Sequence, residues 1–477
     1  MNSSKSEAGP NQLRLFATDN SSSSCWGPKH ETSNIAPKFC NFCCQKWVFS
    51  TYLPGLSLTP LFSLYSAVLK HNITNDERTS KLLDRRWGLS SPDAKINQIM
   101  ILNQKEGRLN GGISFHNITQ PCLGEHMMKM NQSSSFYVVR DDLLHPLVNG
   151  NKARKLDALL PLLEDNAVTD VVRFCCSPQS SDGFIYFGLD LVKSVIINST
   201  FKVEFLMQFH LSTSCCAIFI ICFSIPRSTY AKREEMLVRH AESVVGRDGS
   251  IIWLDDIMKV SSKTDASGEQ NFFSQADAFK CPEESRKVVI INEGAGDAVA
   301  LLGVMRLVKY LSENNLFGEK QALKIVVDAG TGTTAVGLAL GALSLGLPWE
   351  VTAVMLADKI DGYRKKEQNL ISEFLSSTFS SVGLALGREN AGIVQWVERS
   401  LPRKFGNILK GEVQECQKIA QQTGILVDPI YTLAAWDLAT QLSLNEEEDT
   451  KVVMLHTGGT LGMFGLAQRY KSYFQML

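Results

Sequence analysis

The chain has 477 residues and a formal net charge of −1, with 48 Lys and Arg against 49 Asp and Glu. This length is about three times the ~150 residues of an average domain, which predicts a buried core with more than one domain and excludes a small disulfide-stapled scaffold. A composition of 44% hydrophobic and 20% charged residues is that of an ordinary globular protein, and the near-zero charge argues against nucleic acid or an anionic membrane as partners.

The N-terminal segment, residues 1–110, is rich in Ser, Asn and Thr and has no sustained helical or strand period. We expect it to be a disordered extension outside the core. Its first sixty residues hold three acidic and five basic side chains, an acid-poor balance that is typical of organelle transit peptides. The alternative is an unstructured extension that stays in the cytoplasm.

The twelve cysteines occur partly as doublets, such as Cys175-Cys176, without the regular spacing of a disulfide framework. This pattern indicates a reducing compartment. Cys40 and Cys43 form half of a structural zinc site, but no second pair follows them in the sequence. We therefore predict no metal.

From about residue 113 onward, short apolar runs alternate with segments of helical periodicity. The runs that we predict as buried strands are 136–139, 287–292, 325–328, 351–356 and 452–455. An amphipathic helix follows the first of them, with leucines on one face at positions 156, 159, 160 and 163. Continuous apolar strands separated by helices predict an α/β fold with parallel-rich sheets.

Residues 173–225 depart from this pattern, with five of the twelve Cys, eight of the 24 Phe and few charged side chains. The most apolar run in this block, residues 215–223, is shorter than the ~20 residues of a membrane-spanning helix. We therefore predict no transmembrane helix. The polar composition of residues 255–284 predicts a surface loop.

The clearest chemical motif lies at 324–341, where a buried strand, a Gly/Thr loop and a helix follow one another. Such a loop offers backbone N–H groups and the positive end of a helix dipole to an anion. Glycine lets the backbone approach closely at Gly330 and Gly332, and hydroxyl groups to bind phosphate come from Thr331, Thr333 and Thr334. The sequence therefore predicts a phosphate site.

Two alternatives remain for this loop. Gly330-x-Gly332-x-x-Ala335 matches the loose dinucleotide fingerprint, and Asp358, after the next strand, is placed to contact a ribose. A tight strand-to-helix turn without any ligand would have the same pattern.

A second motif, Asn149-Gly-Asn-Lys-Ala-Arg-Lys-Leu156, opens the amphipathic helix. Lys152 lies at the positive end of that helix, and its neighbours Arg154 and Lys155 also disfavour the ammonium form. A lysine with a lowered pKa suits covalent attachment of a carbonyl compound. The alternative is a solvated surface lysine.

Together, the Lys152 segment and the Gly330–Thr334 loop resemble the fold-type-II pyridoxal-phosphate (PLP) enzymes related to the tryptophan synthase β chain. Within them the chain resembles the D-cysteine desulfhydrase and 1-aminocyclopropane-1-carboxylate (ACC) deaminase branch, and its plant mitochondrial members most of all. The resemblance runs from about Gly111 to Tyr470. It implies that Lys152 holds PLP covalently and that Asn151 and the Gly330–Thr334 loop bind its phosphate.

The resemblance extends to two C-terminal segments. Asp428-Pro-Ile-Tyr-Thr432 is similar to the family's Asp-Pro-Val-Tyr segment, whose tyrosine faces the substrate, so Tyr431 is the second catalytic candidate, against the alternative of a core ring. The turn at 452–459 resembles the family's C-terminal loop, and there Thr457, or else Thr432, would hydrogen-bond the pyridine nitrogen. A neutral hydroxyl would leave that nitrogen largely unprotonated.

One family segment is missing. Relatives hold the substrate carboxylate with a Gly-Gly-x-Gln-Ser-x-His turn, whereas this chain has Arg173-Phe-Cys-Cys-Ser-Pro-Gln-Ser-Ser181 at that point. Family-like sequence resumes near Pro226. We therefore expect the block at 173–225 to impair activity.

The resemblance implies a two-domain enzyme with a large PLP-binding domain at 111–165 and 280–477 and a small, atypical domain at 166–279. The expected reaction is that of D-cysteine desulfhydrase, which converts D-cysteine to sulfide, pyruvate and ammonia. Two alternatives are a catalytically silent PLP-binding relative and an NAD-dependent dehydrogenase. We expect a mitochondrial homodimer that acts on a small amino acid, with neither nucleic acid nor membrane as partner.

Overall fold

A computed structural model of the chain describes residues 79–80, 82–103, 113–124, 134–145, 150–175, 197–198, 202–206, 219–224, 232–257, 286–292, 295–376, 392–445 and 449–475. All of them belong to one compact unit, Thr59–Leu477. Most of the predicted N-terminal extension, including Cys40 and Cys43, and most of the predicted loop at 255–284 lie outside the described residues.

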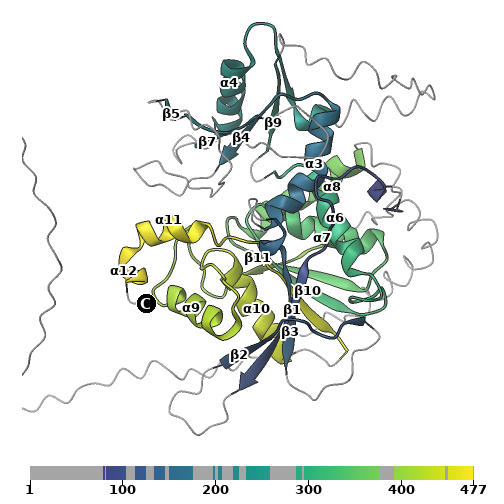
Figure 1. The fold of residues 1–477 in the computed structure, drawn as a ribbon, viewed down its shortest axis with the longest axis vertical. Coiled ribbons are helices and arrows are strands. Elements are labelled where there is room, and N and C mark those ends of the chain that lie inside the picture. Colours follow the sequence, from purple (N-terminus) through teal and green to yellow (C-terminus); the bar gives the residue numbers. More distant parts are fainter. Residues whose placement is uncertain are drawn as a thin grey trace, which may run out of the picture. The chain divides into compact units, whose positions relative to one another are not determined.

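The described residues form a mixed α/β structure with two sheets (Figure 1), which confirms the predicted fold class. The large sheet has seven strands in the order β12-β11-β10-β13-β3-β1-β2. The first five are parallel to one another, and β1 is antiparallel to both of its neighbours. The bounds are β1 Lys95–Asn103, β2 Ile113–Ile118, β3 Ser135–Arg140, β10 Leu323–Ala329, β11 Trp349–Met355, β12 Gln395–Glu398 and β13 Lys451–Leu455.

The start of the core differs from the prediction. Strand β1 lies inside the segment that the sequence assigned to a disordered extension, and Ile99 on it is fully buried. The sequence of β1 does not show a clear apolar alternation, because one of its buried positions is the polar residue Asn97. The Asn97 side-chain amide donates to Asn117 Oδ1 at 2.9 Å. A boundary at residue 110 is therefore wrong, since the core already includes β1.

The small sheet has six strands in the order β5-β6-β7-β4-β9-β8, of which β7, β4, β9 and β8 are parallel. Their bounds are β4 Asp170–Cys175, β5 Ile197–Asn198, β6 Lys202–Leu206, β7 Phe219–Ser224, β8 Ser250–Trp253 and β9 Lys287–Ile291. The compositionally odd block thus supplies strands β5 to β7. Strand β9 belongs to this sheet, so the predicted domain boundary at residue 280 falls too early.

The helices pack on these sheets, and their bounds are α3 Asn151–Asp165, α4 Arg233–Val245, α6 Ala300–Leu311, α7 Thr333–Ser344, α8 Ile360–Ser376, α9 Glu412–Thr423, α10 Thr432–Asn445, α11 Gly462–Arg469 and α12 Lys471–Phe474. A short 3-10 helix, Asp141–Leu143, follows β3. Within the described part of the chain, none of the helices is long and apolar enough to cross a membrane.

Helix α3 lies close to α6. A Cβ atom added at Gly303 of α6 would be 1.9 Å from the carbonyl oxygen of Arg154 on α3. The predicted leucine face of α3 is buried, with Leu159 and Leu163 each 1% exposed. The glycine lets the two backbones approach, and this contact fixes where α3 begins.

We predict that Gly303→Ala lowers the free energy of unfolding by about 2 kcal/mol, because the new methyl group would overlap the Arg154 carbonyl and force the helices apart. Gly465→Ala is the matched control, since that helical glycine has nothing within 4 Å of an added Cβ. The control should be neutral or stabilising by up to about 1 kcal/mol. Urea unfolding measures both, and equal values for the two variants would contradict the α3–α6 contact.

Candidate functional site

Three loops follow neighbouring parallel strands of the large sheet. The chain leaves β3 toward Gly150 and α3, leaves β10 through the Gly330–Thr334 loop into α7, and leaves β13 through His456 and Thr457. Because β3, β13 and β10 are adjacent and parallel, their carboxyl ends share one sheet edge, the usual place for a site in an α/β sheet.

Asn151 joins these three loops. Its side-chain amide donates to Thr334 Oγ1 at 3.0 Å, and its backbone N–H donates to the Thr457 carbonyl at 3.0 Å. Gly150, which precedes it, has a φ of 66°, and an added Cβ would lie 1.8 Å from the same carbonyl. Lys152, the second residue of α3, therefore follows directly after the residue that contacts both the phosphate-loop candidate and the Thr457 turn.

Lys152 is exposed at this helix start, whereas its basic neighbours are buried. Arg154 is 1% exposed and forms an ion pair with Asp141, with an N–O distance of 2.8 Å. Its charge is thus balanced, so the predicted effect of Arg154 on Lys152 is weaker than the sequence suggests.

The Gly330–Thr334 loop enters α7 through Gly332, whose φ of 85° requires glycine. The hydroxyl groups of Thr331 and Thr333 are 3.1 Å apart. No side chain of the described residues caps α7, and its first turn contains no acidic residue. The positive end of the helix is therefore open to an anion, and one hydroxyl of the Thr331–Thr333 pair still has a proton to donate.

Tyr363, on α8, supports this loop and was not predicted from the sequence. Its hydroxyl donates to the Ala329 carbonyl at 2.6 Å and accepts from the backbone N–H of Ala357 at 3.0 Å. Its ring stacks on Trp396, with centroids 4.8 Å apart, and an added Cβ at Gly332 would touch both rings. The loop thus rests on two stacked aromatic rings.

Asp358, the ribose-contact candidate of the dinucleotide alternative, lies at the start of α8. Its Oδ1 accepts from the backbone N–H of Lys359 at 2.8 Å, and an added Cβ at Gly362 would lie 2.1 Å from its Oδ2. The carboxylate is directed at its own helix start, as in an N-terminal cap.

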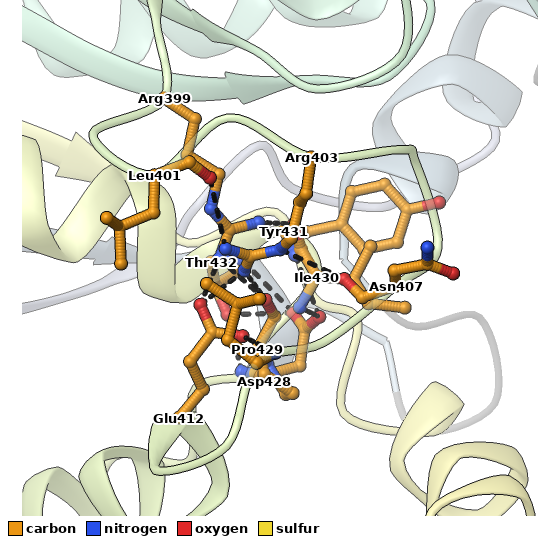
Figure 2. A network of polar contacts seen from close by, with 11 residues as sticks. Arg399, Leu401, Arg403, Asn407, Glu412, Asp428, Pro429, Ile430, Tyr431 and Thr432 are labelled. Atoms are coloured by element: carbon orange, nitrogen blue, oxygen red, sulfur yellow. Dashed lines mark hydrogen bonds and ion pairs between the residues drawn. The ribbon is translucent and has the colours of Figure 1, made fainter.

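The turn that carries Tyr431 is fixed from both sides. Asp428 accepts hydrogen bonds at 2.9 Å from the backbone N–H groups of Ile430 and Tyr431. Figure 2 shows two arginines that converge on the same turn: Arg399 donates to the carbonyls of Pro429 and Ile430, and Arg403 donates to that of Pro429. Both arginines also pair with Glu412.

This clamp brings the Tyr431 ring to the phosphate-loop candidate. A Cβ atom added at Gly330 would lie 3.6 Å from Tyr431 Cε1, an ordinary contact distance. The Phe405 ring packs edge-on against the Tyr431 ring, with centroids 5.6 Å apart. Asn151 thus contacts the end of this loop at Thr334, and Tyr431 lies against its start at Gly330.

Thr457 and Thr432, the two expected hydrogen-bond partners of the PLP ring nitrogen, differ in their own partners. Thr432 is fully buried, and its hydroxyl donates to Asp428 Oδ2 at 2.9 Å and accepts from the Asp428 backbone N–H at 2.7 Å. Thr457 is 7% exposed, and its hydroxyl donates to Asp328 Oδ1 at 2.5 Å. Asp328 was not predicted, because a single acid within an apolar strand carries no local signal.

His456 holds the turn that contains Thr457. Burial lowers its pKa, so the ring is neutral at pH 7. Its Nε2 lies 3.1 Å from the Leu426 carbonyl, and its Nδ1 accepts from the Gly458 N–H at 3.3 Å. These partners are consistent with a proton on Nε2.

Part of the predicted site is outside the described residues. Residues 176–196 follow β4 and include Pro178, Gln179 and Ser180, at the point where the family resemblance led us to expect a carboxylate-binding turn. Within the described ranges, no cluster of three or more His, Cys, Asp or Glu side chains could hold a metal ion.

Several known proteins are similar to this chain over most of its length. A rice (Oryza sativa subsp. japonica) protein named "Putative D-cysteine desulfhydrase 2, mitochondrial" is 45% identical over 81% of this chain and 93% of its own length. A bifunctional mitochondrial D-cysteine desulfhydrase/ACC deaminase of Arabidopsis thaliana is 23% identical over 69% of this chain and 74% of its own length. A D-cysteine desulfhydrase of Serratia proteamaculans is 23% identical over 69% of this chain and 87% of its own length.

No family model matches the chain. Among solved structures, an ACC deaminase homologue has a TM-score of 0.47 and 20% identity and covers 71% of this chain and 89% of its own. The sequence relatives define the class of the chain, which is a PLP-dependent lyase or deaminase. Within this class, the chain belongs to the D-cysteine desulfhydrase and ACC deaminase family. This confirms the predicted family and reaction class, and none of the three sequence relatives is a dehydrogenase.

We predict that Tyr363→Phe lowers the free energy of unfolding by about 1–3 kcal/mol, because it removes the hydrogen bond to the buried Ala329 carbonyl and the one from the Ala357 backbone N–H. Tyr470→Phe is the control, since its hydroxyl makes no hydrogen bond within the described residues, and it should change stability little. Urea unfolding of both variants measures the difference. Equal stability would show that the hydroxyl does not support the loop.

Proposed function

We propose that this chain binds PLP through Lys152 and converts D-cysteine to sulfide, pyruvate and ammonia. The observation that carries the proposal is the pair of hydrogen bonds from Asn151, which bring the Lys152 helix, the Gly330–Thr334 loop and the Thr457 turn together. The names of the relatives support D-cysteine as the substrate.

The side chains around Lys152 fit this cofactor. A phosphate needs several hydrogen-bond donors and positive potential, and the uncapped start of α7 supplies both together with the hydroxyls of Thr331, Thr333 and Thr334. An amine is needed for the covalent link, and Lys152 supplies it within the same junction. A hydroxyl is available for the ring nitrogen at Thr457.

When bound, PLP supplies an electron sink for the substrate's Cα. Lys152 would hold PLP covalently and, once its amine is free, would take the proton from the substrate's Cα as the general base. The Tyr431 ring lies beside Gly330, which supports a role in which its phenol faces the substrate and gives a proton to the departing sulfur. The Asp428 and arginine clamp holds Tyr431 for that role.

Two further proposals concern the cell and the assembly. The rice and Arabidopsis relatives carry mitochondrial names, which supports delivery of this chain to mitochondria, with the cytoplasm as the alternative. We also propose a homodimer. Import of a full-length fluorescent fusion tests the first proposal, and light scattering of the purified chain tests the second.

The proposed function predicts that borohydride reduction of the PLP-loaded protein fixes the cofactor on Lys152, as found by peptide mapping. The Lys152→Arg variant should lose both the adduct and sulfide release from D-cysteine. Lys359→Arg is the control, because Lys359 is an exposed lysine at the start of α8, and it should keep both. An adduct on another lysine would remove the assignment of Lys152.

A second candidate function is a PLP-binding relative without turnover. The observation that favours it is the sequence at 173–181, which lacks the Gly-Gly-x-Gln-Ser-x-His turn of the family. In that case the cofactor absorbance would form but would not respond to D-cysteine.

We predict that replacing residues 173–181 with a family-like segment containing this turn raises sulfide release from D-cysteine at least tenfold. The restored backbone donors and histidine would bind the substrate carboxylate, and a charge-assisted hydrogen bond contributes about 1.5–3 kcal/mol. A variant with the same segment but with its histidine replaced by alanine separates carboxylate binding from improved folding. Equal rates for the unmodified and repaired chains would show that the block already binds substrate.

A further inference from the structure

Asp328 is a buried carboxyl group for which the reaction described above has no use. It lies near the carboxyl end of β10, two residues before Gly330, and is 6% exposed. A carboxylate at such a position is costly unless it is hydrogen-bonded or opposed by a positive charge. Its position at the sheet edge where Lys152, Thr334 and Thr457 meet therefore calls for a physical reason.

The Asp328 side chain accepts a hydrogen bond from the Thr457 hydroxyl. The distance from Thr457 Oγ1 to Asp328 Oδ1 is 2.5 Å, within the range of a hydrogen bond from a hydroxyl to a charged carboxylate. A hydroxyl has one proton to donate and two lone pairs. Because the proton is directed at Asp328, the oxygen of Thr457 is left to act as an acceptor toward any third group.

The surrounding charges favour a cation near this pair. Burial and the nearby Asp428 raise the pKa of Asp328 to about 7, and Lys155 of α3 opposes them as a weaker influence. Near pH 7 the negative charge of the buried Asp328 carboxylate is therefore not fully balanced by a nearby positive charge. A protonated group on the other side of Thr457 would supply that positive charge.

We propose that Asp328 is a positioning residue that acts through Thr457, so that the Thr457 oxygen accepts a hydrogen bond from the protonated ring nitrogen of PLP. This inference rests on the proposed function, since it takes PLP as the cofactor and Thr457 as the ring-nitrogen contact. It replaces the sequence-based expectation of a neutral hydroxyl and an unprotonated nitrogen. The chain supplies a carboxylate charge to that nitrogen, with one hydroxyl between them.

The test loads the full chain with PLP carrying ¹⁵N at the ring nitrogen and records the ¹⁵N chemical shift at pH 7.5 without substrate. The wild type should show the shift of a protonated pyridine. Asp328→Asn keeps the shape and an acceptor oxygen for Thr457 but removes the charge, and its shift should move to that of the unprotonated ring. Asp297→Asn is the control, because it also removes a buried carboxyl group whose pKa is raised to about 7, and it should leave the shift unchanged.

A second pair of variants guards against misfolding of the Asp328 variant. Thr457→Val removes the connecting hydroxyl and should give the unprotonated shift, while Thr457→Ser restores the hydroxyl and should return the protonated one. An unprotonated nitrogen in the wild type, or a protonated one in Asp328→Asn, would overturn the inference while leaving PLP binding intact. Failure of the wild type to bind PLP would overturn the proposed function itself.

Discussion

Two hydrogen bonds from Asn151 hold the start of α3 against two other loops of the large sheet. One reaches the hydroxyl of Thr334, at the beginning of α7, and the other reaches the carbonyl of Thr457, after β13. The next residue is Lys152, so its backbone position depends on both contacts. The contact of α3 with Gly303 of α6 fixes the helix on its other side. A shift of α3 would therefore separate Lys152 from both loops.

Buried polar groups give the loops around Lys152 their fixed shape. Asp428 accepts hydrogen bonds from the backbone of Ile430 and Tyr431, while Arg399 donates to carbonyls on the other side of the same turn. The Tyr363 hydroxyl likewise fixes the end of β10, because it donates to the Ala329 carbonyl. A buried donor or acceptor left unpaired costs about 1–3 kcal/mol, so these loops resist any motion that would break the contacts. The site is consequently built on rigid turns.

The sequence was sufficient for features that depend on local pattern. The apolar runs at 136–139, 325–328 and 452–455 are strands β3, β10 and β13, because a strand buried on both faces is continuously apolar. It was insufficient for β1, where buried Asn97 interrupts the pattern, and for the strands within 173–225. The family resemblance named Lys152, Tyr431 and Thr457, and these assignments stay predictions.

Asp328 and Tyr363 could not be found in this way, since their importance arises from partners more than 30 residues distant. Asp328 contacts Thr457 across two neighbouring strands, and Tyr363 contacts Ala329 from a helix that follows the next strand. Such contacts depend on the order of strands in the sheet. Local periodicity carries no information about that order.

The place of β13 between β3 and β10 has a consequence for biosynthesis. The ribosome releases β3 and β10 long before residues 451–455 emerge. Until then, the strand that pairs with both of them in the middle of the large sheet is missing from the nascent chain. The edges of β3 and β10 then expose unpaired backbone groups, which are prone to pair with other chains. A message truncated shortly before codon 451 would thus yield a protein that retains most of its residues yet aggregates, and chaperone demand should peak during synthesis of the last third of the chain.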